Sequence, residues 1–134
     1  MPSAHSGTFR IDRGRSNWSN GKFPPNMSLT IHLTVEGDTF EYHVVNDTRP
    51  ESLYLVDFVA KRDGQPYPST GRGTDHVSMK QLRDDEYQLI KTLKGDITCV
   101  EYWRFVEDND VVIKHGSIQR EDGIMAYVEY FRRQ

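Results

Sequence analysis

The sequence lacks the features on which several protein classes depend. Cys99 is the only cysteine among 134 residues, so no internal disulfide can form and a reducing, cytoplasmic location is expected. No apolar run approaches the length of a membrane span. The first residues have neither the basic start nor the apolar run of a secretory signal. We therefore expect one domain over residues 1–134 that builds its core without disulfides.

The sequence also lacks the patterns that mark nucleic-acid, metal and phosphate binding. The net charge is −3, with acidic and basic residues interspersed, whereas nucleic-acid binding normally needs a basic face. The five histidines are scattered and form no metal-ligand spacing. Gly71-Arg72-Gly73 is not followed by a helical pattern, so it does not fit a phosphate loop. We expect no nucleic acid, metal or cofactor.

Short alternating segments make up most of the chain. Leu29, Ile31, Leu33 and Val35 share one face of a strand, and a tight turn leads to a hairpin partner. Nine strand candidates follow from this pattern: 7–12, 27–35, 40–44, 52–61, 77–79, 87–89, 97–106, 111–115 and 124–133. Sequential hairpins predict an all-β, antiparallel up-and-down barrel of 8–10 strands with a central ligand cavity; a two-sheet sandwich is the alternative.

Two stretches interrupt the strands. Residues 14–26 are rich in Ser, Asn, Gly and Pro, and we expect a loop there that carries Trp18 and Phe23 over the mouth of the barrel. Residues 63–75 contain two prolines and three glycines, and we expect an irregular corner between two groups of strands. The inward face of residues 52–61 and 97–106 is left open.

The chain resembles small bacterial lipocalin-like proteins of the calycin superfamily, whose activities are largely unassigned. The segments that carry the resemblance are Gly7-Thr8-Phe9, Ser16-Asn17-Trp18 with Pro24-Pro25, 63–71, 75–79 and Phe131-Arg132-Arg133. Phe9 replaces the tryptophan that opens such chains, and Phe131 replaces a terminal tyrosine. The resemblance implies a ligand-holding barrel in which Arg133 packs over Phe9, and it implies no reaction.

Aromatic residues are frequent on the expected strands. They fill a core or line a ligand pocket, which in a barrel of this size is the same place. The residues expected to bind a ligand are Trp18, Tyr42, Tyr54, Phe58, Tyr102, Trp103, Phe105 and Tyr127.

Three ionisable residues are candidates for catalysis. Lys114 is expected to face water, which sends His115 inward, where an imidazole can act as a general acid or base or simply as a hydrogen-bonded core group. Asp57 and Glu129 are carboxylates on largely apolar strands, and Glu129 is expected to face inward. Glu101 is a further partner of undecided direction, and Arg104 is an alternative cross-strand partner for Glu101 or Glu129.

Two functions from different classes fit these residues. The first is binding of a small, largely apolar or aromatic molecule inside the barrel. The alternative is a cofactor-independent enzyme (a cyclase, isomerase or dehydratase) that uses His, carboxylate and Tyr groups in the same pocket. Residues 53–59 and 124–131 are apolar on both faces, so a homodimer through the outer faces is also expected.

Overall fold

The computed structural model describes residues 3–134, which form ten β-strands and no helix long and apolar enough to cross a membrane. The strands are β1 (Gly7–Trp18), β2 (Leu29–Glu36), β3 (Thr39–Asn46), β4 (Tyr54–Lys61), β5 (Asp63–Pro68), β6 (His76–Arg83), β7 (Glu86–Leu93), β8 (Asp96–Val106), β9 (Val111–Arg120) and β10 (Gly123–Arg133).

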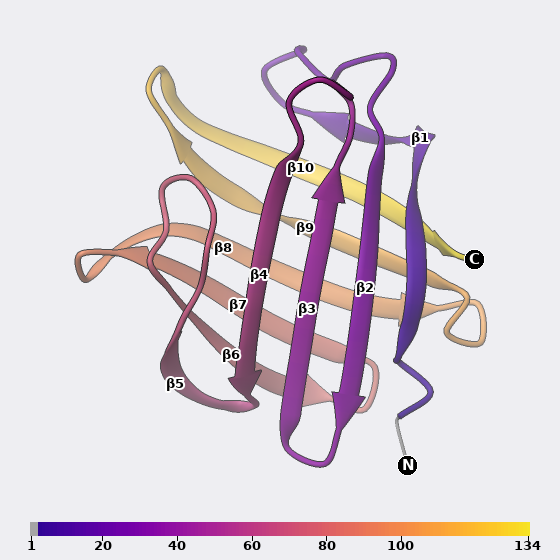
Figure 1. Ribbon diagram of the computed structural model, residues 1–134, viewed down its shortest axis with the longest axis vertical. Coiled ribbons are helices and arrows are strands. Elements are labelled where there is room, and N and C mark those ends of the chain that lie inside the picture. Colours follow the sequence, from indigo (N-terminus) through magenta and orange to yellow (C-terminus); the bar gives the residue numbers. More distant parts are fainter. Residues whose placement is uncertain (1–2) are drawn as a thin grey trace.

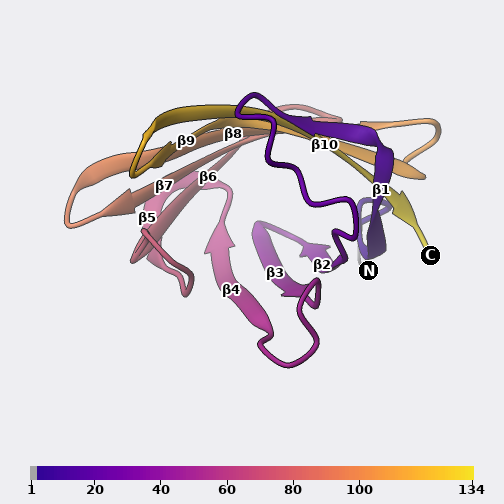
Figure 2. The same cartoon turned by 90° about the horizontal axis from the view of Figure 1, so that it is seen from above.

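The sheet follows the order β4-β3-β2-β1-β10-β9-β8-β7-β6-β5, and all its pairs are antiparallel. β2, β3 and β4 form one layer, which faces the longer layer of β6 to β10 and β1 (Figures 1 and 2). The edge strands β4 and β5 approach each other through an isolated bridge between Phe58 and Ser69. The fold is therefore a nearly closed up-and-down barrel, as predicted.

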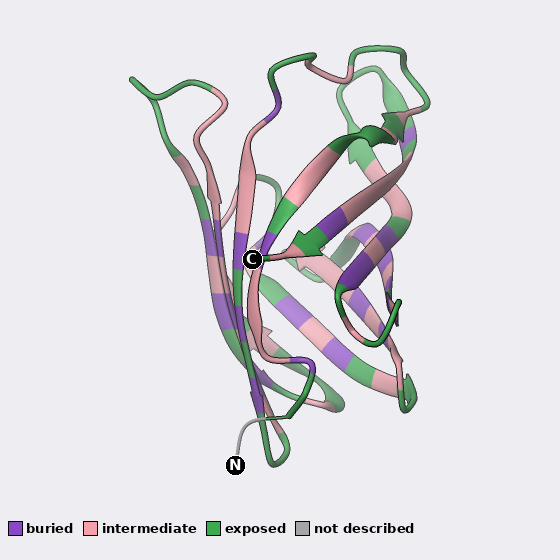
Figure 3. Cartoon of the chain, turned by 90° about the vertical axis from the view of Figure 1, so that its right-hand side faces the viewer, coloured by how far each residue is buried: buried purple, intermediate pink, exposed green. Residues whose placement is uncertain are grey.

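Buried and more exposed residues alternate along most strands (Figure 3). On β2, Ile31, Leu33 and Val35 are buried and the residues between them are exposed. The same alternation shows which face of β4 and of β8 points inward, a choice that the sequence left open. Val56 and Phe58 of β4 point inward, as do Trp103 and Phe105 of β8.

β1 is longer than the sequence predicted. Residues 14–18 were expected in a loop, but Asn17 and Trp18 pair with Val128 and Tyr127 of β10 beyond a bulge. Ser16 bridges this bulge, because its Oγ donates to the carbonyl of Asp12 and accepts from the amide of Tyr130. A serine hydroxyl can replace ladder bonds locally, which the alternation pattern does not reveal.

β5 is the strand that the sequence analysis missed. The prolines in residues 63–75 predicted an irregular stretch, yet Pro66 and Pro68 lie opposite Ser78 and His76 of β6. β5 is at an edge of the sheet, where a residue without an N–H donor is tolerated because only one side of the strand is paired. The irregular part of the corner begins after Pro68.

Candidate functional site

Two rows of side chains cross the inner face of β8, β9 and β10. In the first row, Gly116 of β9 lies between Glu101 and Tyr127. In the second row, Lys114 lies between Trp103 and Glu129. Because cross-strand partners are neighbours on the same face of a sheet, these rows bring two carboxyl groups and an amine together inside an otherwise apolar barrel.

Glu101 is buried and is held by two donors. Its Oε2 accepts from Trp103 Nε1 and its Oε1 accepts from the Tyr127 hydroxyl, both at 2.5 Å. Cys99 Sγ lies 3.4 Å from the same hydroxyl. Burial opposes ionisation, but the charges of Lys114 and Lys91 and the two hydrogen bonds outweigh it and lower the pKa of Glu101. Glu101 is thus a buried carboxylate.

Gly116 lets β9 lie close against the backbone of β8. A Cβ atom at this position would meet the carbonyl oxygen of Val100 and the Cα of Glu101 at distances that real Cβ atoms do not show. With glycine there, the Tyr127 hydroxyl reaches Glu101 across the intervening strand.

Lys114 is only 4% exposed, and aromatic groups surround its amine. Nζ donates to the Tyr42 hydroxyl at 2.5 Å. It also lies 4.2 Å from the ring centre of Trp103, 4.5 Å from that of Tyr42 and 5.0 Å from that of Phe131. Among residues 3–134, no ion pair within 4 Å involves this amine. Burial lowers the pKa of Lys114 to about 8, against the opposing attraction of Glu101 and Glu129.

Glu129 shares the second row with Lys114 but behaves differently from Glu101. Its Oε2 accepts one hydrogen bond, from Trp18 Nε1 at 2.9 Å. Burial raises the pKa of Glu129, although the Trp18 bond and Lys114 oppose this effect. The two carboxyl groups therefore have pKa values shifted in opposite directions, as is typical of sites that hold and move protons.

The N-terminal segment, residues 3–6, packs against the end of the barrel where Tyr87 and Phe105 lie. His5 stacks on Phe105 with ring centres 4.0 Å apart, and its Nδ1 lies 2.7 Å from the Tyr87 hydroxyl. Burial lowers the pKa of His5. Arg133 lies 4.7 Å from the ring centre of Phe9, which confirms the expected contact. Its guanidinium also donates to the carbonyls of Ala4, Ser6 and Asn109.

Most residues expected to bind a ligand face the interior. Trp18, Tyr54 and Tyr127 are partly buried on the inner side, through their contacts with Glu129, the core and Glu101 respectively. Buried in the core or in the Glu101 and Lys114 rows are Tyr42, Phe58, Trp103 and Phe105. Tyr102 is the exception, because it alternates with buried Glu101 and Trp103 and therefore points outward, stacked on His115.

The structure contradicts the inward direction expected for His115, and it places Asp57, whose direction was open, outside the barrel as well. His115 is exposed and Lys114 is buried, the reverse of the expectation. Asp57 also lies on the outer face, where its Oδ1 is 2.7 Å from His43 Nδ1. The hydrogen bond to Asp57 raises the pKa of His43. Glu129 faces inward as expected, and Arg104 is exposed, away from both carboxylates.

The sequence contained a signal that places Lys114 inside. The β9–β10 hairpin turns at Glu121 and Asp122, which pairs Lys114 with Glu129. An inward Glu129 therefore requires an inward Lys114. The assumption that lysine faces water overrode this register. It failed because the Tyr42 hydroxyl and the rings of Tyr42, Trp103 and Phe131 surround the amine inside the barrel.

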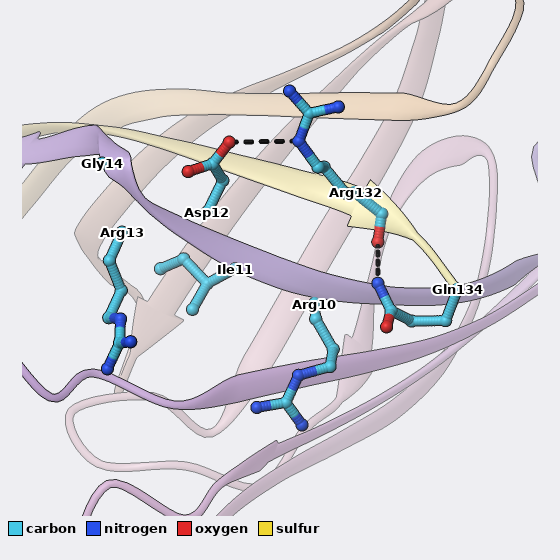
Figure 4. A pocket seen from close by; sticks show the side chains of 7 residues that line it. All are labelled: Arg10, Ile11, Asp12, Arg13, Gly14, Arg132 and Gln134. Atoms are coloured by element: carbon cyan, nitrogen blue, oxygen red, sulfur yellow. Dashed lines mark hydrogen bonds and ion pairs between the residues drawn. The ribbon is translucent and has the colours of Figure 1, made fainter.

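Two hollows lie away from this cluster. One, of about 450 Å³, is lined by residues 10–14, Arg132 and Gln134. Figure 4 shows Arg10 and Arg13 pointing away from Arg132, whose Nε donates to Asp12 at 3.1 Å, so the three guanidinium groups do not converge. The other, of about 130 Å³, lies between the ends of β8, β9 and β10. Neither hollow is lined by Lys114 or Glu101, and residues 3–134 contain no cluster suited to a metal ion.

Solved structures share this architecture. One is a Schistosoma mansoni fatty acid binding protein in complex with arachidonic acid, with a TM-score of 0.68 and 10% identity over 98% of this chain and 97% of that chain. The shared fold is an antiparallel up-and-down β-barrel. Another is a zebrafish ileal bile acid-binding protein complexed with cholic acid, with a TM-score of 0.65 and 9% identity over 98% of this chain and 100% of that chain. The sequence matches no protein-family model and no curated protein.

Proposed function

We propose that this calycin barrel binds a small, largely apolar molecule that carries an anionic head group, as a lipocalin-like carrier of the kind that its motifs resemble. The observation that supports this function is the buried amine of Lys114. This amine has one hydrogen bond and no carboxylate within ion-pair distance among the described residues. A ligand carboxylate would supply the missing partner, and the aromatic residues around it would contact the apolar part.

The two solved structures described above are complexes with an acid, arachidonic acid in one and cholic acid in the other. The interior cluster of this chain lies outside the two hollows described above. We expect a ligand to displace some of the partly buried residues that pack against the core, which are Ile11, Leu29, Tyr54 and Tyr67.

A fluorescence titration with decanoate and decanol tests the role of the amine, because Trp103 lies beside Lys114 and reports on its surroundings. Decanoate should bind more tightly than decanol. Lys114→Met should weaken decanoate binding about tenfold to a hundredfold, the usual effect of losing a hydrogen bond to a charged group, while decanol binding should be retained. Lys80→Met, on the exposed face of β6, is the matched control. Equal affinities of decanoate for wild type and Lys114→Met would refute the proposal.

Glu129 and Lys114 are cross-strand partners, and burial raises the pKa of the first and lowers that of the second, which favours a second candidate, a cofactor-independent isomerase. Protonated Glu129 would donate a proton while the neutral amine of Lys114 accepts one. Conversion of a β,γ-unsaturated ketone to its conjugated isomer, followed by ultraviolet absorbance, tests this reaction. Glu129→Gln should abolish it and His115→Ala should leave it unchanged, because His115 lies outside the barrel. Absence of turnover in the wild type would remove this candidate.

We also propose that two copies associate through their outer faces. Leu53, Leu55 and Val59 are about half exposed along one side of the barrel, at 55%, 48% and 49%. Leu55 and Val59 lie on β4 and Leu53 directly precedes it, and exposed apolar residues that lie together favour burial against a partner surface.

A further inference from the structure

Lys114 differs from every other lysine of the chain in its surroundings. Lys91 is half-buried, and the remaining four, Lys22, Lys61, Lys80 and Lys94, are exposed. Only Lys114 combines full burial with an aromatic enclosure formed by Tyr42, Trp103 and Phe131. Its Nζ uses one of its donors on Tyr42, which leaves the nitrogen available to a molecule that enters the barrel.

An amine becomes a nucleophile when it loses its proton. Burial lowers the pKa of Lys114 to about 8. At neutral pH about one molecule in ten would therefore hold a neutral amine, against fewer than about one in a thousand for an ordinary lysine. Lysines in apolar surroundings are used for Schiff-base chemistry for this reason.

The neighbours of Lys114 supply the other two groups that such chemistry needs. Glu129 lies directly opposite on β10, and its raised pKa keeps its carboxyl group protonated over a wider pH range than usual. Glu101 lies one row away and is held as a carboxylate by Trp103 and Tyr127. A proton donor and a negative counter-charge therefore stand on either side of the amine.

We propose that Lys114 forms an imine with an apolar aldehyde inside the barrel. This inference rests on the proposed binding function and specifies a class of ligand for the same site. The Lys114 nitrogen attacks the carbonyl carbon, a C–N bond forms, and one N–H proton passes to the carbonyl oxygen to give a carbinolamine. Glu129 then protonates the hydroxyl group, which leaves as water as the C=N bond forms. The product of this step is a protonated imine beside an ionised Glu129, and return of the N–H proton to Glu129 gives the neutral imine. The sum is then aldehyde and amine to imine and water, with no oxidation or reduction.

The surroundings of Lys114 would also stabilise the product. A protonated imine carries the positive charge that Tyr42, Trp103 and Phe131 already face, and Glu101 balances it. Tyr42 remains placed to accept a hydrogen bond from the nitrogen.

Reductive trapping tests the proposal. The purified protein is incubated with cinnamaldehyde and sodium cyanoborohydride at about neutral pH, and the modified lysines are located by peptide mass spectrometry. Lys114 should carry about ten times as much label as any other lysine, since its neutral fraction is about three hundredfold higher and its burial slows access. Lys114→Arg should remove this label, and Lys91→Arg should not. Label spread evenly over the exposed lysines, with Lys114 unmodified, would overturn the inference.

The pH profile and a second variant keep the test independent of the folding of Lys114→Arg. Labelling of Lys114 in the wild type should rise with pH and level off above about pH 8, whereas labelling of the exposed lysines should continue to rise. Glu129→Gln should slow labelling of Lys114 several-fold. Parallel pH profiles for all lysines would contradict the proposed chemistry. If Lys114 stays unmodified while decanoate binds in a Lys114-dependent way, the imine inference fails and the binding function stands; if decanoate does not bind either, both fail.

Discussion

At the residue scale, the burial of Lys114 links stability to pH. The pKa of this group falls from its ordinary 10.5 to about 8 in the folded protein, so between these values the unfolded chain binds more protons than the native state. Stability therefore rises with pH across this window, and the gain is lost as pH falls through about 8. A neutral side chain at this position should not show this dependence.

Lys114→Met provides the measurement. The difference in the free energy of unfolding between the wild type and this variant should increase by about 3 kcal/mol from pH 7.5 to pH 10.5. This is the amount expected when the pKa of one group falls from 10.5 to about 8 on folding. Urea denaturation at a series of pH values measures this difference. A difference that is constant with pH would show that the amine is solvated in the folded protein.

At the element scale, Gly116 sets how closely β8 and β9 approach. Gly116→Ala would place a Cβ against the backbone of Val100 and Glu101 and force the strands apart. We expect a loss of about 1–3 kcal/mol in the free energy of unfolding, as for other overpacked sites. The neighbouring Ser117→Ala should change stability by less than about 0.5 kcal/mol. Equal thermal midpoints for the two variants would contradict the close approach.

The attachment of residues 3–6 to the closed end of the barrel depends on Arg133. Its forked guanidinium reaches carbonyls of both the N-terminal segment and the β8–β9 turn, and lysine cannot reproduce this geometry. Arg133→Lys should lower stability by about 1–3 kcal/mol. It should also speed hydrogen exchange at the start of β1. Arg132→Lys, whose exposed side chain pairs with Asp12, should cost less than about 1 kcal/mol. Unchanged exchange in Arg133→Lys would show that the segment is held by His5 and Ser6 instead.

At the scale of the whole molecule, the exposed residues of β4 predict association of two copies. Sedimentation at increasing protein concentration should show a dimer, and Leu55→Glu should shift it to a monomer because a charge would be buried in the contact. Glu51→Gln, outside the exposed apolar residues, serves as the control. A strict monomer at high concentration in the wild type would remove the proposed interface.

The sequence predicted the barrel more accurately than it predicted which residues of β9 face the interior. Alternation along residues such as Leu29 to Val35 depends only on one face being buried, so it predicted the barrel directly. β5 was missed because its prolines are tolerated at an edge, and edges depend on the closure of the whole sheet. Glu129 was placed correctly, whereas Lys114 and His115 were interchanged because residue type was given more weight than hairpin register.

The most direct test of the anchoring role of Lys114 is a carbon NMR spectrum of decanoate labelled with ¹³C at its carboxyl group, recorded with the wild type and with Lys114→Met. An acid held by the buried amine should give a second resonance, shifted from that of free decanoate. This resonance should disappear in Lys114→Met and persist in Lys80→Met. A wild-type spectrum with only the free resonance, or a bound resonance that is unchanged in Lys114→Met, would contradict the proposed function.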